Sequence, residues 1–168
     1  NQDDAEAQSN LGLMYYNGEG VRQDYAKAVE LFQKAANQGH APTQYRLGLM
    51  YDNGEGVHQD YAKAVEWYTK AANQGLALAQ YSLGLMYYNG EGVRQDYAKA
   101  LEWYTKAANQ GSASAQSNIG VMYKNGEGVR QDYAKALEWY QKGANQGVAQ
   151  SQHNLGVMYK NGEGVLQD

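Results

Sequence analysis

The pentapeptide Asn-Gly-Glu-Gly-Val occurs five times in this chain, and the interval between one copy and the next is always 36 residues. With Ala5 as the first position of a unit, the period divides the chain into 5–40, 41–76, 77–112, 113–148 and a partial unit 149–168. Self-similarity at such a period is typical of solenoids, in which each unit buries its apolar face against its neighbours. We therefore expect residues 1–168 to form a single repeat domain. The repeat is cut at both ends, which suggests a piece of a longer array.

Each unit reads as two helices separated by a glycine-rich turn. In positions 1–12 of a unit, small or apolar residues recur at 1, 7, 8 and 11 and glutamine recurs at 4, which together is helical spacing. The two glycines of the pentapeptide allow the positive φ angles of a tight reversal. Asp24, Asp60, Asp96 and Asp132 then stand where a second helix needs an N-cap. The pattern predicts an all-α solenoid of 36-residue helix-turn-helix repeats.

Three kinds of residue repeat inside this scheme. Glycine recurs at position 8, inside the first helix, where it costs about 1 kcal/mol relative to alanine. We expect the backbone of a neighbouring helix to come too close there for a Cβ atom. The glutamates of the pentapeptide, such as Glu127, are interpreted as the solvated edge of the turn. The tryptophans Trp67, Trp103 and Trp139 recur at position 27 and are expected to pack between units.

The pattern A-x-A-Q-x-N-L-G-x-M-Y-x-N-G-x-G-V resembles the Sel-one-like repeat, a subclass of the tetratricopeptide-repeat superfamily. Residues 113–144, ASAQSNIGVMYKNGEGVRQDYAKALEWYQKGA, show the resemblance well, with Ile119 at the usual leucine. The resemblance implies a right-handed superhelix whose first helices line the concave side. It also implies a scaffold or adaptor that binds proteins, secreted or periplasmic if the source is bacterial.

Composition argues against several classes of function. Lys and Arg number 14 against 18 Asp and Glu, a net charge of −4, which does not suit a nucleic-acid-binding surface. The chain has no cysteine, and its histidines, His40, His58 and His153, fall at three unrelated positions of the unit. No apolar run reaches the roughly 18 residues of a membrane span. We expect no enzyme, no metal or cofactor and no membrane insertion, but a monomer that binds a protein or peptide.

One stripe of the first helices differs from unit to unit. Positions 2, 5, 9 and 12 lie on one side of a helix, beside the constant positions 1, 4, 8 and 11 that all units need for stacking. We expect the varying stripe to line a groove that binds an extended or helical peptide. The candidate binding residues on and beside this stripe are Tyr45, Arg46, Leu49, Leu78, Tyr81, Leu85, Tyr88, Asn118, Lys124, His153, Asn154 and Lys160. An apolar or aromatic anchor would lie over the second and third units, and acidic residues toward the fifth. The alternative is that Leu49 and Leu85 belong to the core and the variation is neutral.

Two further interpretations stay open. One is a bacterial envelope enzyme or a β-lactam- or peptidoglycan-binding protein; a cysteine-rich branch of the resembling family has reported β-lactam binding, but this chain lacks its cysteines. No nucleophile with a neighbouring base supports catalysis. The other is a designed consensus array without an evolved partner, which the near-identity of the units suggests. The irregular residues Pro42, Arg46 and His153 argue against it, because a consensus design would repeat those positions.

Overall fold

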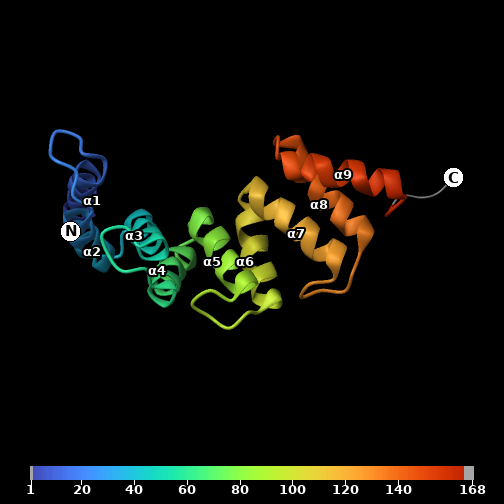
Figure 1. The fold of residues 1–168 in the computed structure, drawn as a ribbon, viewed down its shortest axis with the longest axis horizontal. Helices are drawn as coiled ribbons and strands as arrows, with labels where there is room; N and C mark the ends of the chain where they lie inside the picture. Colours follow the sequence, from blue (N-terminus) through green and yellow to red (C-terminus); the bar gives the residue numbers. More distant parts are fainter. Residues whose placement is uncertain (1, 165–168) are drawn as a thin grey trace.

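The computed structural model describes residues 2–164, and helices are the only regular secondary structure in that range. The helices are α1 (Gln2–Asn17), α2 (Tyr25–Asn37), α3 (Ala41–Asn53), α4 (Tyr61–Asn73), α5 (Ala77–Asn89), α6 (Tyr97–Asn109), α7 (Ala113–Asn125), α8 (Tyr133–Asn145) and α9 (Ala149–Asn161). Each complete unit contributes one pair of helices, and the pairs follow one another along an elongated, curved array (Figure 1). The predicted all-α solenoid is confirmed.

The ends of the helices are where the local sequence predicts them. The carboxylate of Asp60 accepts a 3.0 Å hydrogen bond from the backbone N–H of Lys63, and Asp24, Asp96 and Asp132 cap their helices in the same way. Gly54 ends α3 with a φ of 74°, the left-handed conformation that side chains disfavour. Every second helix therefore starts at the same position of its unit.

The glycine at position 8 packs against an aromatic ring, so the expected approach of a neighbouring backbone is wrong at this position. A Cβ atom on Gly84 would lie 2.6 Å from Cδ1 of Tyr104, which belongs to the second helix of the same unit. The same relationship joins Gly12 to Phe32, Gly48 to Tyr68 and Gly120 to Tyr140. These four rings are almost fully buried. The missing side chain is therefore what allows a large ring into the centre of each unit.

A close approach of backbones occurs instead between units, at the second glycine of the turn. A Cβ atom on Gly128 would lie 2.6 Å from the carbonyl carbon of Tyr97, at the start of the preceding unit's second helix. Trp67 reinforces the same kind of boundary, since it joins a buried cluster with Phe32 and Leu47 across the first two units. The expectation that the tryptophans pack between units is confirmed at this position.

A series of buried glutamine side chains connects neighbouring units through hydrogen bonds. Nε2 of Gln44 donates a 3.0 Å bond to the carbonyl oxygen of Ala36 in the unit before it. Nε2 of Gln74 donates a 2.7 Å bond to Oε1 of Gln44 within the second unit. Gln80 and Gln116 repeat the arrangement further along the array. Since buried polar groups need partners, this pairing explains why every unit has glutamine at position 4.

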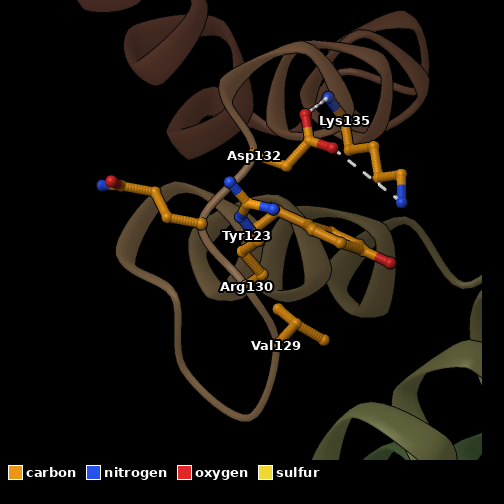
Figure 2. A pocket seen from close by; sticks show the side chains of 6 residues that line it. Tyr123, Val129, Arg130, Asp132 and Lys135 are labelled. Carbon is orange, nitrogen blue, oxygen red and sulfur yellow. Dashed lines mark hydrogen bonds and ion pairs between the residues drawn. The ribbon is translucent and has the colours of Figure 1, made fainter.

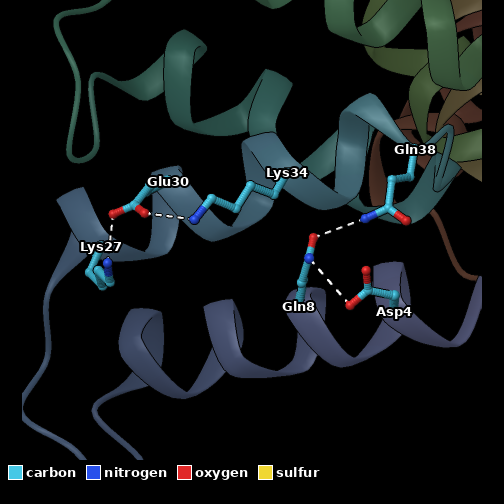
Figure 3. A network of polar contacts seen from close by, with 6 residues as sticks. All are labelled: Asp4, Gln8, Lys27, Glu30, Lys34 and Gln38. Atoms are coloured by element: carbon cyan, nitrogen blue, oxygen red, sulfur yellow. Dashed lines mark hydrogen bonds and ion pairs between the residues drawn. The ribbon is translucent and has the colours of Figure 1, made fainter. Parts of the chain in front are cut away.

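The first unit shows the outer surface of such a pair (Figure 3). Nε2 of Gln38 reaches Oε1 of Gln8 at 3.0 Å, which links α2 to α1. Along α2, the carboxylate of Glu30 lies between the ammonium groups of Lys27 and Lys34, at 2.6 and 2.9 Å. Hydrogen bonds from these two lysines lower the pKa of Glu30 to about 2. These ion pairs are exposed to solvent and contribute little to stability.

Candidate partner-binding face

The twelve residues predicted to bind a partner all keep part of their surface open to solvent. Leu78, near the start of α5, is 58% exposed. Leu49 and Leu85 are half-buried: each lies against a buried cluster at the boundary that follows its own unit, and neither is part of it. The face that varies from unit to unit is therefore neither fully buried nor fully solvated.

Two tyrosines of this face lie against the central ring of their own unit. The rings of Tyr45 and Tyr68 are 5.7 Å apart between centroids, and those of Tyr81 and Tyr104 are 5.8 Å apart. Aromatic pairs at such centroid separations add stability beyond simple burial. Tyr45 and Tyr81 are half-buried, while Tyr68 and Tyr104 are fully buried. Each pair thus presents the outer tyrosine at the surface on a rigid support.

A cavity of about 150 Å³ opens where the third unit meets the fourth. Its lining residues are Leu85, Tyr88 and Asn89 from α5, Tyr104 from α6, and Asn118 and Val121 from α7. Leu85, Tyr88 and Asn118 are predicted binding residues, and the structure brings them together here. Asn89, Tyr104 and Val121 were not predicted, because the sequence does not show which residues of neighbouring helices will enclose a space.

A second cavity, of about 90 Å³, occupies the corresponding position between the first and second units. Its lining residues are Tyr16, Phe32, Arg46, Leu49, Met50, Asn53 and Glu55. Arg46 and Leu49 were predicted. Arg46 is exposed, and its guanidinium forms no ion pair among residues 4–164. The two cavities are therefore equivalent in place but different in chemistry.

Three of the turn glutamates, Glu55, Glu127 and Glu163, connect neighbouring units, so their interpretation as a solvated edge is incomplete. The hydroxyl of Tyr16 donates a 2.7 Å hydrogen bond to Glu55 of the next unit. Farther along, the ammonium of Lys124 lies 3.8 Å from the carboxylate of Glu163. The sequence shows both members of each pair, at positions 12 and 15 of successive units, but not that the units are rotated so that they meet.

Burial and a neighbouring amide act in opposite directions on two central tyrosines. Burial raises the pKa of Tyr104 well above its ordinary value, while the side chain of Asn118 lowers it. Burial likewise raises the pKa of Tyr140 to about 12, against a lowering by Asn154.

The other predicted residues line neither cavity. Lys124 is held by Glu163, as described above, while His153 and Lys160 are exposed on α9. Tyr45, Tyr81 and Leu78 lie between the two cavities in the order of the units. The structure thus places the predicted residues along successive first helices and gathers five of them into two cavities.

Open hollows also recur beside the turns, on a different part of each unit (Figure 2). The hollow of the fourth unit has a volume of about 520 Å³ and is lined by Tyr123, Val129, Arg130, Gln131, Asp132 and Lys135. That of the third unit, about 590 Å³, uses the same positions. Asp132 caps α8, and the ammonium of Lys135 lies 5.2 Å from the ring centre of Tyr123. Because these residues serve the turn in both units, the hollows are a consequence of the repeat.

Neither a metal site nor a membrane-spanning helix is found in the described part of the chain. Among residues 4–164, no three His, Asp or Glu side chains are grouped so that they could hold a metal ion. Within the same range, no helix combines the length and the apolar character that crossing a membrane requires.

The stacked helix pairs and their variable face define a helical-repeat scaffold, a fold consistent with protein–protein interaction. The profile of the Sel1 repeat family matches residues 5–40, 41–76, 77–112, 113–148 and 149–168. The chain belongs to the Sel1 repeat family. Proteins of this family are typically non-enzymatic, and their repeats mediate protein interactions. No curated protein matches the chain at a significant level.

Solved bacterial structures share the fold closely. The protective antigen c5321 of uropathogenic Escherichia coli strains, which displays an SLR fold, is 49% identical, with a TM-score of 0.94 over 96% of this chain and 34% of that chain. A Sel1 repeat protein from Oxalobacter formigenes is 36% identical, with a TM-score of 0.94 over 99% of this chain and 69% of that chain. Helicobacter pylori cysteine rich protein B, 24% identical, has a TM-score of 0.61 over 82% of this chain and 99% of that one and shows the fold alone. The chain spans about a third of the Escherichia coli antigen.

Proposed function

We propose that the chain is a non-enzymatic scaffold that binds a peptide or protein segment along the face formed by its first helices, α1, α3, α5, α7 and α9. The observation that carries this proposal is the pair of cavities at equivalent boundaries with different linings. Arg46 in one corresponds to Asn118 in the other, and Phe32 corresponds to Tyr104. Stacking needs the same residues at every boundary, so differences at these cavity positions suit recognition of different groups along a partner.

The chemistry of the face indicates what the partner presents. The guanidinium of Arg46 is exposed, forms no ion pair with the described residues and lies beside the apolar side chains of Phe32 and Leu49. Because the carboxylate of Glu55 lines the same cavity, an acidic group of the partner suits the exposed side of Arg46, next to an apolar group. The supported rings of Tyr45 and Tyr81 and the exposed Leu78 suit an apolar or aromatic anchor over the second and third units. The exposed His153 and Lys160 suit acidic groups toward the fifth unit.

A displayed random-peptide library tests the proposal directly. We expect the chain to enrich peptides that have an acidic residue some distance from an apolar or aromatic one. Arg46→Ala and the double variant Tyr45→Ala with Tyr81→Ala should each weaken binding of these peptides about tenfold or more. Glu66→Ala is the matched control, because Glu66 is exposed on the second helix α4.

Circular dichroism would verify that each variant keeps its helices. If the enriched peptides bind the face variants as tightly as the original chain, or if no peptide is enriched, the proposed function is contradicted. If Glu66→Ala weakens binding instead, the binding face is the one formed by the second helices.

A further inference from the structure

The hydroxyl of Tyr104 is a buried polar group without a partner. The residue is 0% exposed, and its Oη has no hydrogen-bond partner among the described residues. Nearly all buried polar side-chain atoms in proteins are hydrogen-bonded. Tyr104 lines the cavity of about 150 Å³ between the third and fourth units, so this buried residue lies beside a hollow rather than in solid packing on all sides.

The equivalent position of the first two units leaves no hydroxyl free. Phe32 has none, and Tyr68 donates a 2.9 Å hydrogen bond to Oδ2 of Asp52 in its own unit. In the third unit the residue that corresponds to Asp52 is Tyr88, whose own hydroxyl is committed to Glu127 at 2.7 Å. Tyr104 therefore lacks the acceptor that Tyr68 has. Position 12 of its unit is occupied by Tyr88, which bonds to Glu127 of the next unit instead.

The lining of this cavity selects for a neutral guest. None of its six side chains is charged: Leu85 and Val121 are apolar, while Tyr88, Asn89, Tyr104 and Asn118 are polar. A charged group would lose its hydration without meeting an opposite charge. The carboxylate of Glu127, bonded to Tyr88, would repel an anion in particular.

A tyrosine hydroxyl and an asparagine amide can each donate and accept a hydrogen bond. A primary carboxamide has the complementary pair, one carbonyl oxygen and one NH₂ group. A volume of about 150 Å³ exceeds the roughly 30 Å³ that one water molecule occupies in the liquid, so that a group of several heavy atoms fits.

We infer that the cavity between the third and fourth units receives the primary carboxamide of an asparagine or glutamine side chain of the partner. The hydroxyl of Tyr104 and the amide of Asn118 bind its polar atoms, and Leu85 and Val121 contact its methylene groups. The inference rests on the proposed function for the source of the carboxamide, but a small free amide would enter the same cavity.

Propionamide is the probe for the cavity itself. In an NMR titration, it should shift the side-chain amide resonances of Asn118, whereas propionate and propylammonium, which have similar size, should bind at least tenfold more weakly. Tyr104→Phe should weaken propionamide binding at least tenfold. This variant keeps the ring against Gly84, as Phe32 does against Gly12. Tyr68→Phe is the matched control and should leave propionamide binding unchanged, because the hydroxyl of Tyr68 is already bonded.

Asn118→Ala is the second variant and should also weaken propionamide binding. Equal binding of the three probes, or equal binding by the original chain and both cavity variants, would overturn the inference. Absence of any response to propionamide would overturn it too.

Peptides separate this inference from the proposed function. Replacing the carboxamide residue of an enriched peptide by leucine should weaken binding to the original chain about tenfold but leave binding to Tyr104→Phe almost unchanged. If peptides bind along the face without any need for asparagine or glutamine, the carboxamide site is wrong and the proposed function stands. If propionamide binds and no peptide does, the site stands and the proposed function fails.

Discussion

The hydroxyl of Tyr88 donates a 2.7 Å hydrogen bond to Oε2 of Glu127, which lies in the turn of the following unit. The acceptor is a carboxylate, so the bond is stronger than one between two neutral groups. The same bond joins Tyr16 to Glu55 two units earlier. The boundary between the second and third units has Asp52 at the donor position, and a carboxylate cannot donate to the glutamate of the next turn. Neighbouring units of nearly identical sequence are thus fastened in different ways.

Removing the Tyr88 hydroxyl should loosen the boundary between the third and fourth units. Tyr88→Phe is expected to lower the free energy of unfolding by about 1 kcal/mol, somewhat less than is usual for a bond to a charged group, because the pair is only partly buried. Denaturation in urea would measure the change. Tyr87→Phe, one residue away, is the control and should have a much smaller effect. Equal losses in the two variants would show that the bond to Glu127 does not stabilise the fold.

Two chemically identical substitutions at the centres of neighbouring units should differ in effect. Tyr68→Phe breaks the bond to Asp52 and is expected to cost about 1.5–3 kcal/mol of stability. Tyr104→Phe should be close to neutral, or slightly stabilising, because its hydroxyl has no partner to lose. The comparison of urea midpoints for the two variants checks this. A large destabilisation by Tyr104→Phe would mean that its hydroxyl is hydrogen-bonded in solution.

The glycines at position 8 offer a second matched pair. A Cβ atom on Gly84 would lie 2.6 Å from the ring of Tyr104, whereas one on Gly156 would meet nothing within 4 Å. Gly84→Ala is expected to destabilise the chain by about 1–3 kcal/mol through overpacking. Gly156→Ala should stabilise it by up to about 1 kcal/mol, because alanine favours a helix. Thermal melts would show shifts of opposite sign. Shifts of the same sign would contradict this explanation of the repeated glycine.

Alkaline pH should unfold the chain through its partly and fully buried tyrosines. Burial and the bond to Glu127 raise the pKa of Tyr88 to about 12, and burial raises that of Tyr140 to about 12, from an ordinary 10.0. In this window the unfolded chain loses protons that the folded chain retains. The contribution of these two tyrosines to the free energy of unfolding is therefore fully present below pH 10 and is lost as the pH rises toward 12.

Melting temperatures recorded between pH 9 and pH 12, alongside the tyrosinate absorbance, would test the alkaline loss. The double variant Tyr88→Phe with Tyr140→Phe should have a shallower loss over this window. A melting temperature that stays constant over the same range would contradict it.

Part of the candidate site could be predicted from the sequence. The variation at positions 6 and 9 indicated Arg46, Leu85 and Asn118, which line the two cavities. The glutamate of the turn was misread because its partner lies a full unit away. Tyr104 was not among the predicted residues, since nothing in the pattern shows that its hydroxyl would lack an acceptor.

The amino-acid sequence alone determines the 36-residue period, the helices and their ends. These depend on local chemistry: aspartate caps a helix, glycine permits a left-handed turn, and apolar residues recur at helical spacing. Only the tertiary structure decides that Tyr88 meets Glu127, that the position-8 glycines accommodate aromatic rings, and that Tyr104, with its unpartnered hydroxyl, lines a cavity. The physical reason is that these contacts depend on the rotation and separation of neighbouring units, which arise from the packing of many residues together.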